Sequence, residues 1–192
     1  MSAIVKPRYT LEEYFELERT SEEKYEYFNG EVFCMSGTTR NHSLIAGNIL
    51  AALKSALRGQ GCEVHGPDLR VRTPGLPPYR YPDVSVVCGP MVRAAEDPLA
   101  VVNPALLAEV TSDSTEDYDR GEKLRHYQHL ASVREILLVS HREPRLTLYA
   151  RQESGWSVVE ATRGEEVTLD SVGVRLAVDE IYRAGLEDTP AS

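Results

Sequence analysis

The sequence has few cysteines, no long apolar run and more acidic than basic side chains. Its 192 residues include 3 Cys, 21 Lys and Arg, and 30 Asp and Glu, which gives a net charge of −9. No segment approaches the ~18 consecutive apolar residues of a membrane span, and the N-terminus lacks the apolar core of a secretory signal. We therefore expect a cytoplasmic protein with no membrane partner.

The cysteines and the missing motifs exclude several common functions. Cys34, Cys62 and Cys88 lie far apart and form no CxxC pair. This spacing suggests neither a disulfide framework nor a zinc site, so we expect reduced, buried thiols, with Cys34 in the core. The sequence lacks GxGxxG, P-loop, HExxH and GxSxG motifs. Dinucleotide binding, NTP hydrolysis, zincin chemistry and serine-elbow hydrolysis therefore lose their usual sequence support.

The acidic charge argues against a large nonspecific nucleic-acid surface, because binding to phosphates depends on Lys and Arg. The charge is unevenly spread, however. Residues 1–35 hold 4 basic and 8 acidic side chains, whereas residues 120–151 hold 7 and 3. We expect an anion to prefer the 120–151 segment.

Hydrophobic periodicity predicts the order of the secondary structure. The expected helices are 10–19, 41–58, 119–131 and 179–184. The expected strands are 25–28, 31–35, 63–72, 79–88, 105–111, 136–140, 146–151, 156–160 and 167–169. Asn29-Gly30 between the first two strands is typical of a type I′ hairpin turn.

This order favours an α/β fold: a mixed central β-sheet flanked by helices, with an N-terminal hairpin and a C-terminal strand extension. No repeat or linker divides the chain. We expect one domain over residues 1–186 and a flexible tail at 187–192.

Two carboxylates stand in otherwise apolar strands. Asp83 begins a buried segment after Pro82, and Glu109 interrupts the apolar run 106–110. A carboxylate at such a position is costly unless something pairs with it. Their alternative role is a structural ion pair or a loop cap.

A lysine falls on the apolar side of the predicted helix 119–131. At about 100° per residue, Arg120, Leu124, Tyr127, Leu130 and Ala131 share one arc, and Lys123 lies inside it. Lys123 should therefore face the core, unless its long stem reaches past the core rim to water.

Together these three charges suggest a catalytic metal site. Asp83 and Glu109 on neighbouring strands would form a hard oxygen site suited to Mg²⁺ or Mn²⁺, and Lys123 would compensate their charge. Such a site suits hydrolysis of a phosphodiester: the metal activates water, and the lysine offsets charge in the transition state.

The same residues carry a resemblance to a known family. The sequence resembles the PD-(D/E)XK restriction-endonuclease-like superfamily and, more closely, the bacterial Uma-two family of endonucleases. The matching motifs are YEYFNGEV at 25–32, His42, YPDV at 81–84, EVTSDST at 109–115 and YDRGEKL at 118–124. The resemblance covers residues 9–186 and implies a restriction-endonuclease-like fold and metal-dependent DNA cleavage.

Under this resemblance, Pro82-Asp83 corresponds to the proline-aspartate pair of the superfamily, and Glu109 corresponds to its second acid. One position departs from the pattern: the superfamily expects lysine two residues after the second acid, where this chain has Thr111. The Uma-two family is similar in this respect, with its lysine coming from the following helix. Lys123 fits that place.

Four further residues are candidates for auxiliary roles at this site: Glu31, His42, Asp68 and Arg120. Glu31 and Asp68 are candidate extra acids near the metal, although exposed positions are commoner for such residues. His42 could contact the substrate phosphate or support a metal ligand, or it could simply be satisfied by local hydrogen bonds. Arg120 could contact a phosphate or serve as ordinary surface charge.

We predict an endonuclease that uses Mg²⁺ or Mn²⁺ to cleave DNA. The alternative is a non-catalytic nucleic-acid-binding or regulatory protein on a nuclease scaffold, and a third reading is another hydrolase with the same metal site. A homodimer is also expected, because two-fold symmetry would place two sites on antiparallel strands of DNA.

Overall fold

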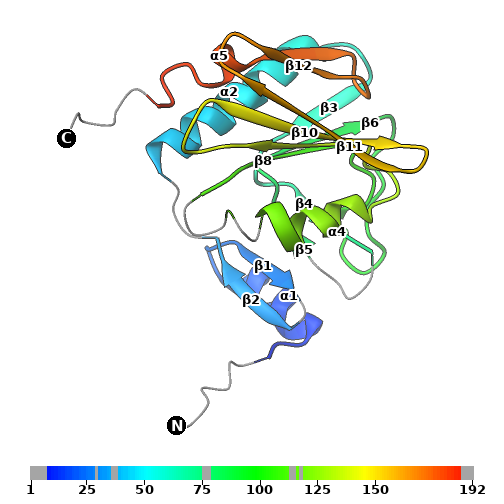
Figure 1. Ribbon diagram of the computed structural model, residues 1–192. Helices are drawn as coiled ribbons and strands as arrows, with labels where there is room; N and C mark the ends of the chain where they lie inside the picture. The colour runs from blue at the N-terminus through cyan, green and yellow to red at the C-terminus, as the bar shows by residue number, and fades with distance from the viewer. Residues whose placement is uncertain are drawn as a thin grey trace, which may run out of the picture.

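The computed structural model describes residues 8–28, 30–35, 39–74, 79–112, 116 and 119–186. Within these residues, helices and short strands surround one central sheet (Figure 1). The helices are α1 (Leu11–Thr20), α2 (Arg40–Ala56), the π-helix η1 (Asp119–Lys123), α4 (Leu124–Gln128) and α5 (Val178–Ile181). The proposed tail at 187–192 lies outside the described residues.

The central sheet has six strands and is mixed. Their spatial order is β11 (Gly155–Thr162), β10 (Arg145–Gln152), β9 (Glu135–Val139), β8 (Leu106–Val110), β6 (Val84–Cys88) and β3 (Cys62–His65). β8 and β9 are parallel, and the other neighbours are antiparallel. This arrangement confirms the predicted α/β fold with a mixed sheet and a C-terminal strand extension.

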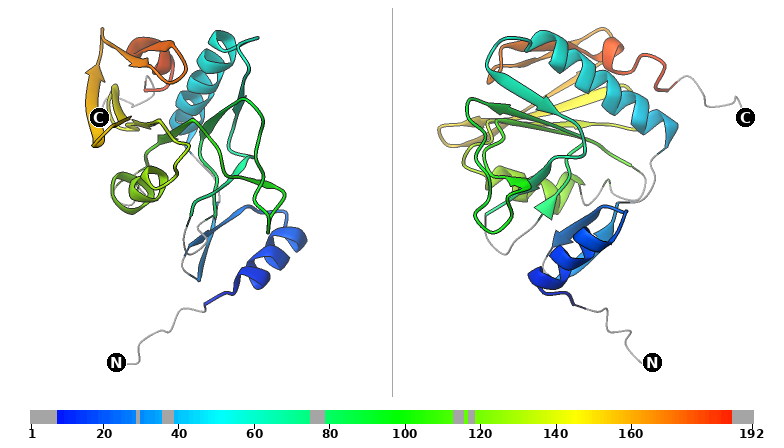
Figure 2. Two further views of the ribbon diagram at one scale, coloured as in Figure 1. Left: turned by 90° about the vertical axis from the view of Figure 1, so that its right-hand side faces the viewer. Right: turned by 180° about the vertical axis from the view of Figure 1, so that it is seen from behind.

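Helices cover both faces of the central sheet (Figure 2). Ile45 and Ile49 of α2 pack on one face, and Leu124 and Tyr127 of α4 pack on the other. All five residues of β8 are therefore buried. This double coverage explains why β8 reads as an apolar run and why Glu109 within it is unusual.

A second sheet holds the predicted N-terminal hairpin. Its order is β2 (Glu31–Cys34), β1 (Tyr25–Phe28), β5 (Tyr79–Arg80), β4 (Arg70–Arg72) and β7 (Ala100–Val101). Thr10 and Glu13 form a capping box at the start of α1, as predicted. Tyr14 of α1 stacks on Tyr79, with ring centroids 5.6 Å apart. α1 and the hairpin lie together on one side of the central sheet (Figure 1).

Two of the predicted strands are each divided between the two sheets. Residues 63–72 contribute to β3 and β4, and residues 79–88 contribute to β5 and β6. Pro67 and Pro82 lie at the breaks, because proline has no N–H to continue a strand ladder. The prediction of two continuous strands is wrong, and Asp83 lies where the chain passes from one sheet to the other. The strands β7 and β13 (Val174–Ala177), the latter paired with β12 (Glu166–Leu169), were not predicted.

The predicted helix 119–131 is shorter and less regular than its pattern suggests. Its first turn is the π-helix η1, and α4 ends at Gln128. Lys123 is buried, as the helical arc predicts, but Ala131 lies beyond the helix and is exposed. Asp119, four residues before Lys123 and on the same side of the helix, is buried as well.

The prediction for the cysteines is wrong in two respects. Cys62 of β3 and Cys88 of β6 are directly paired across the antiparallel strands and form a disulfide. Cys34 is a free thiol, but it is exposed at the end of β2 rather than buried. A separation of 26 residues does not reveal cross-strand pairing, because only the register brings the two sulfur atoms together.

Thiol titration tests this correction. The native protein should show one reactive thiol per chain, and reduction under unfolding conditions should raise this to three. Cys34→Ser should remove the native signal, because Cys34 supplies the accessible thiol. Three reactive thiols in the unreduced, unfolded protein would contradict the disulfide.

Candidate active site

Glu109 is the central acid of the site. It lies near the end of β8, and its side chain is 5% exposed. The Tyr127 hydroxyl donates to its Oε1 at 2.5 Å, and the Lys123 ammonium lies 2.9 Å from the same oxygen. α4 and η1 thus supply both partners, which compensate the burial of the carboxylate.

Asp83 lies next to Glu109, immediately before the neighbouring strand β6. The pairing of Val84 with Ala108, continued by one residue, places Asp83 opposite Glu109. The backbone N–H of Val110 donates to Asp83 Oδ2 at 2.8 Å, and His42 Nε2 lies 3.3 Å from that oxygen. Asp83 is 15% exposed, so solvent reaches it more readily than it reaches Glu109.

The structure therefore brings together Asp83, Glu109 and Lys123, the three residues on which the sequence hypothesis depends. His42, from the first turn of α2, joins them through Asp83. Its backbone N–H also donates to Oγ1 of Thr39, the N-cap residue of that helix, at 3.2 Å. The local cap and the contact with Asp83 are thus both present.

Two further carboxylates surround Lys123 and were missed by the sequence reasoning. Glu26 Oε1 and Asp119 Oδ1 lie 3.8 and 3.7 Å from the Lys123 ammonium, and both side chains are buried. Glu26 also accepts the Tyr81 N–H at 3.0 Å. The available signal for Glu26 was its place beside Tyr25 and Tyr27 in a strand with few polar residues.

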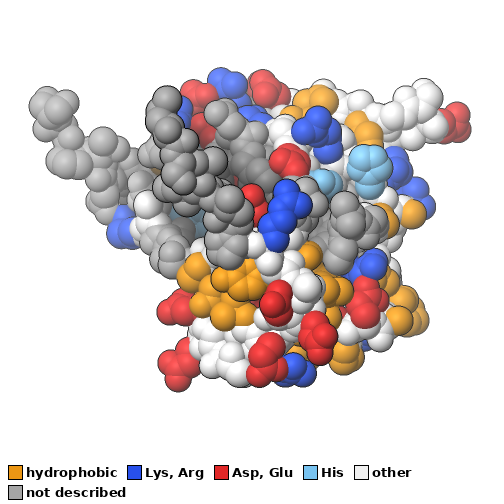
Figure 3. All heavy atoms as spheres, turned by 90° about the horizontal axis from the view of Figure 1, so that it is seen from below, with side chains coloured by type: hydrophobic (Ala, Val, Ile, Leu, Met, Phe, Trp, Pro, Cys, Tyr) orange, Lys and Arg blue, Asp and Glu red, His pale blue; other side chains and the backbone are white. Residues whose placement is uncertain are grey.

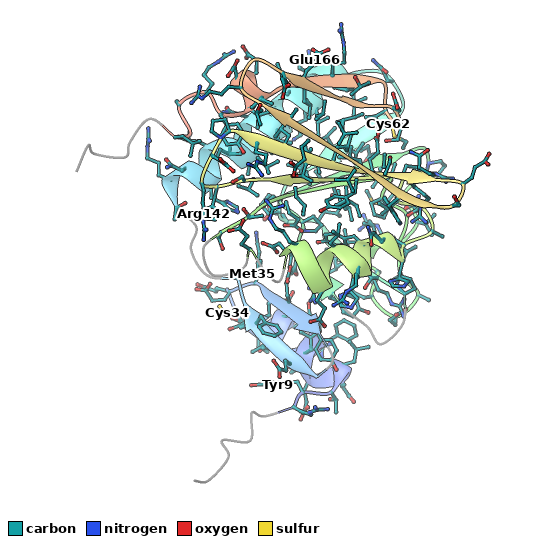
Figure 4. The ribbon with its side chains drawn as sticks, in the orientation of Figure 1. Tyr9, Cys34, Met35, Cys62, Arg142 and Glu166 are labelled. Carbon is teal, nitrogen blue, oxygen red and sulfur yellow. A yellow bond between two sulfur atoms is a disulfide. The ribbon has the colours of Figure 1, made fainter. Side chains whose placement is uncertain are left out.

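The other acidic candidates lie elsewhere. Glu31 begins β2 beside Gly30, whose carbonyl accepts the Tyr9 N–H. Tyr9 marks the end of the hairpin far from the central sheet, whereas Cys34 and Met35 mark the near end (Figure 4). Glu26, paired with Phe33, is therefore the hairpin acid that reaches Lys123.

Asp68 and Arg120 do not contact the central group through any interaction that the described residues show. Asp68 is 84% exposed and pairs with Lys24. Arg120 pairs with Glu116 at 3.3 Å, one turn before Lys123.

Burial and neighbouring charges shift the proton affinities of the central residues. Burial raises the pKa of Glu109 to about 8, and Asp83 and Asp119 act in the same direction, while Lys123 opposes them. Burial alone would lower the pKa of Lys123, but Glu109, Glu26 and Asp119 hold it above its ordinary value. Burial also disfavours charged His42, yet its hydrogen bond to Asp83 raises the pKa overall.

The carboxylate oxygens of Asp83 and Glu109 are the candidate ligands for a divalent cation. Across the described residues, the contacts of Asp83 fall on Oδ2 and those of Glu109 on Oε1. Those residues contain no ready-made group of three His, Cys, Asp or Glu ligands. Mg²⁺ commonly uses only one or two carboxylates and completes its shell with water and phosphate oxygens. The Asp83–Glu109 pair fits such an ion.

Comparison with known proteins identifies the family. A family model named Uma2, with the description "Putative restriction endonuclease", matches residues 11–179. The chain belongs to the Uma2 family. This confirms the resemblance and establishes a nuclease-type scaffold.

The chain is also similar to individual proteins over much of its length. Two proteins of Synechocystis sp., slr1290 and sll1609, are 36% and 30% identical to the chain. The matches cover 92% and 68% of the chain, and 93% and 73% of the respective relatives. A solved structure from Anabaena variabilis, described as a "putative nuclease belonging to DUF820", superposes with a TM-score of 0.73 at 18% identity. It covers 92% of this chain and 99% of its own, which confirms the fold.

The surface of this Uma2 protein is not uniformly basic. In the view from the hairpin side, both acidic and basic side chains lie around an apolar patch (Figure 3). No helix of the described part is long and apolar enough to cross a bilayer.

Removing the buried Lys123 ammonium should destabilise the fold. Lys123→Met leaves Glu109, Glu26 and Asp119 without their shared counter-charge, so we expect a loss of about 3–5 kcal/mol in unfolding free energy. Urea denaturation measures this loss. Glu109→Gln in the Lys123→Met background should recover part of it, because one of the unpaired acids is then neutral.

Lys54→Met is the matched control, since Lys54 is exposed on α2. Its effect should stay within about 0.5 kcal/mol. Equal urea midpoints for Lys123→Met and the control would contradict the buried charge cluster.

Proposed function

We propose that this protein is an endonuclease that hydrolyses phosphodiester bonds in DNA with Mg²⁺ or Mn²⁺. The observation that carries the proposal is the convergence of Asp83, Glu109 and Lys123, with the lysine ammonium 2.9 Å from Glu109. Two carboxylates and one cation from three separate elements are costly to gather in a core without a chemical role. Membership in the Uma2 family, whose description is "Putative restriction endonuclease", supports the same conclusion. The DNA of a bacterial cell is in the cytoplasm, so we propose that the protein acts there.

The chain's own residues would divide the work as follows. Asp83 and Glu109 would hold the cation, which when bound would polarise the phosphoryl oxygen and make water a better nucleophile. Lys123 orients the attacking water and offsets the negative charge that develops on the phosphoryl oxygens. Tyr127 fixes the Glu109 carboxylate, and His42 fixes that of Asp83.

Glu26 and Asp119 act as positioning residues in this scheme. Each lies within 4 Å of the Lys123 ammonium and is buried, so they keep the amine charged and limit where it points. Glu31 and Asp68 have no role in the mechanism proposed here.

Metal-dependent cleavage tests the function. Asp83→Asn and Glu109→Gln should each reduce cleavage of plasmid and single-stranded DNA by roughly 10²–10³-fold in Mg²⁺ or Mn²⁺. A gel assay measures cleavage, and circular dichroism checks folding. Glu166→Gln, on the remote strand β12, should cleave like the wild type.

Wild-type protein that binds DNA or RNA without cutting either in both metals would favour a non-catalytic binding protein instead. Cleavage of carboxylic esters but not of nucleic acid would favour a different hydrolase on the same site.

We further propose that two chains associate through β11. This strand is the outermost strand of the central sheet within the described residues, and it is eight residues long. Val158 and Val159 on it are 54% and 51% exposed. A long apolar edge readily pairs with a second copy, and a two-fold dimer would present two sites to DNA.

Light scattering after size-exclusion chromatography tests the association. The wild type should show about twice the chain mass of 21.4 kDa, and the Val158→Lys, Val159→Lys double variant should show a single chain mass. A wild type that elutes at 21.4 kDa over the accessible concentration range would contradict the dimer.

A further inference from the structure

Two arginines from different elements hold one carboxylate beside the candidate active site. Arg120 Nε lies 3.3 Å from Glu116 Oε1, and an Arg142 guanidinium nitrogen lies 3.3 Å from Glu116 Oε2. Arg120 belongs to η1, whereas Arg142 follows β9. We call these three residues the arginine clamp.

His141 and the buried Thr111 orient the outer arm of the clamp. Arg142 Nε donates to His141 Nε2 at 3.3 Å, so this ring nitrogen carries no proton. In the neutral ring the proton is then on Nδ1, which donates to Thr111 Oγ1 at 2.9 Å. Thr111 is fully buried at the end of β8. The arm of Arg142 is thereby tied to the rigid core.

The clamp flanks the proposed catalytic residues along the chain. Thr111 follows Glu109 by two residues, and Arg120 precedes Lys123 by three. Arg142 lies at the end of the central sheet that faces the near end of the hairpin (Figure 4). The side chains of Arg120 and Arg142 are 32% and 59% exposed, so both are accessible to a ligand.

The geometry of the clamp suits a phosphate. A guanidinium fork recognises the oxygens of a carboxylate and of a phosphate in the same way, and Glu116 presents one oxygen to each arginine. The chain carries a net charge of −9, so a nucleic acid needs a local cationic anchor. Both arginines of the clamp lie in the 120–151 segment, where basic residues predominate.

We propose that Arg120 and Arg142 bind a backbone phosphate of the nucleic acid next to the cleaved bond. Glu116 occupies this phosphate site when no nucleic acid is bound and competes with it. This inference rests on the proposed function, and it adds a phosphate-binding site together with an internal competitor for that site.

Binding without metal tests the clamp separately from catalysis. Fluorescence anisotropy with labelled duplex and single-stranded DNA, in EDTA and across a salt series, measures the dissociation constant of the full chain. Arg120→Ala and Arg142→Ala should each weaken binding roughly tenfold. Each should also reduce the slope of log affinity against log salt by about 0.9 for duplex DNA.

Glu116→Gln should change the affinity in the opposite direction. Removing the competing carboxylate should tighten binding severalfold without changing which phosphate contacts are made. Glu143→Gln is the matched control: it removes the same charge one residue from Arg142, but Glu143 pairs with Arg145 instead. Arg163→Ala, on a remote exposed pair with Asp179, controls for the loss of an arginine.

The outcomes separate this inference from the proposed function. If Arg120→Ala and Arg142→Ala bind DNA with the wild-type affinity and salt slope, the clamp is overturned, even if Asp83→Asn still abolishes cleavage. If Glu116→Gln binds no more tightly than Glu143→Gln, the role of Glu116 as competitor is overturned. If the wild type does not cleave DNA but the arginine variants bind it more weakly as expected, the clamp is supported and the nuclease function is overturned.

Discussion

The buried ammonium of Lys123 is the charge on which the site depends. It lies within 4 Å of carboxylate oxygens of Glu109, Glu26 and Asp119, which come from β8, β1 and η1. None of these acids could remain ionised in the interior alone, because an unpaired buried charge costs several kcal/mol. The buried Arg80, whose Nε lies 3.7 Å from Glu26 Oε2, is a second cation of this cluster, and the three acids still leave an excess of negative charge. Such an excess suits a divalent cation, and it adds to the burial that raises the pKa of Glu109 to about 8 despite its contact with Lys123.

The two sheets meet where these charges gather. The chain leaves the second sheet at Arg80, passes Pro82 and Asp83, and enters the central sheet at Val84. Glu26 ties this junction to the hairpin by accepting the Tyr81 N–H, and Asp83 ties it to β8 by accepting the Val110 N–H. The same backbone that joins the sheets therefore also fixes both sides of the site. Preorganisation of this kind is what a site needs if its charges are to act without rearrangement.

The sequence predicts the three central site residues, but it does not predict the features that depend on the register of strand pairing. Asp83 stood out because it begins an apolar segment, Glu109 because it interrupts one, and Lys123 because it falls among the apolar residues of its helix. Glu26 and Asp119 did not stand out, because a carboxylate in a hairpin or in a first helical turn is ordinarily solvated. Glu31 was chosen as the hairpin acid from its motif, but the pairing of Glu26 with Phe33 puts Glu26 at the near end. The Cys62–Cys88 disulfide was missed for the same reason, since only the pairing of β3 with β6 aligns the two residues.

The departure at Thr111 has a physical consequence for the whole site. A lysine at this position would project from the same strand face as Glu109, two residues further on. Here the amine comes from η1 instead, where Glu26 and Asp119 can surround it. The strand position is therefore occupied by Thr111, whose small hydroxyl contacts His141, which in turn contacts Arg142. With the lysine on the helix, two residues share two tasks that one strand residue could not perform together. Lys123 compensates the charge of Glu109, and Thr111 supports Arg142 through His141.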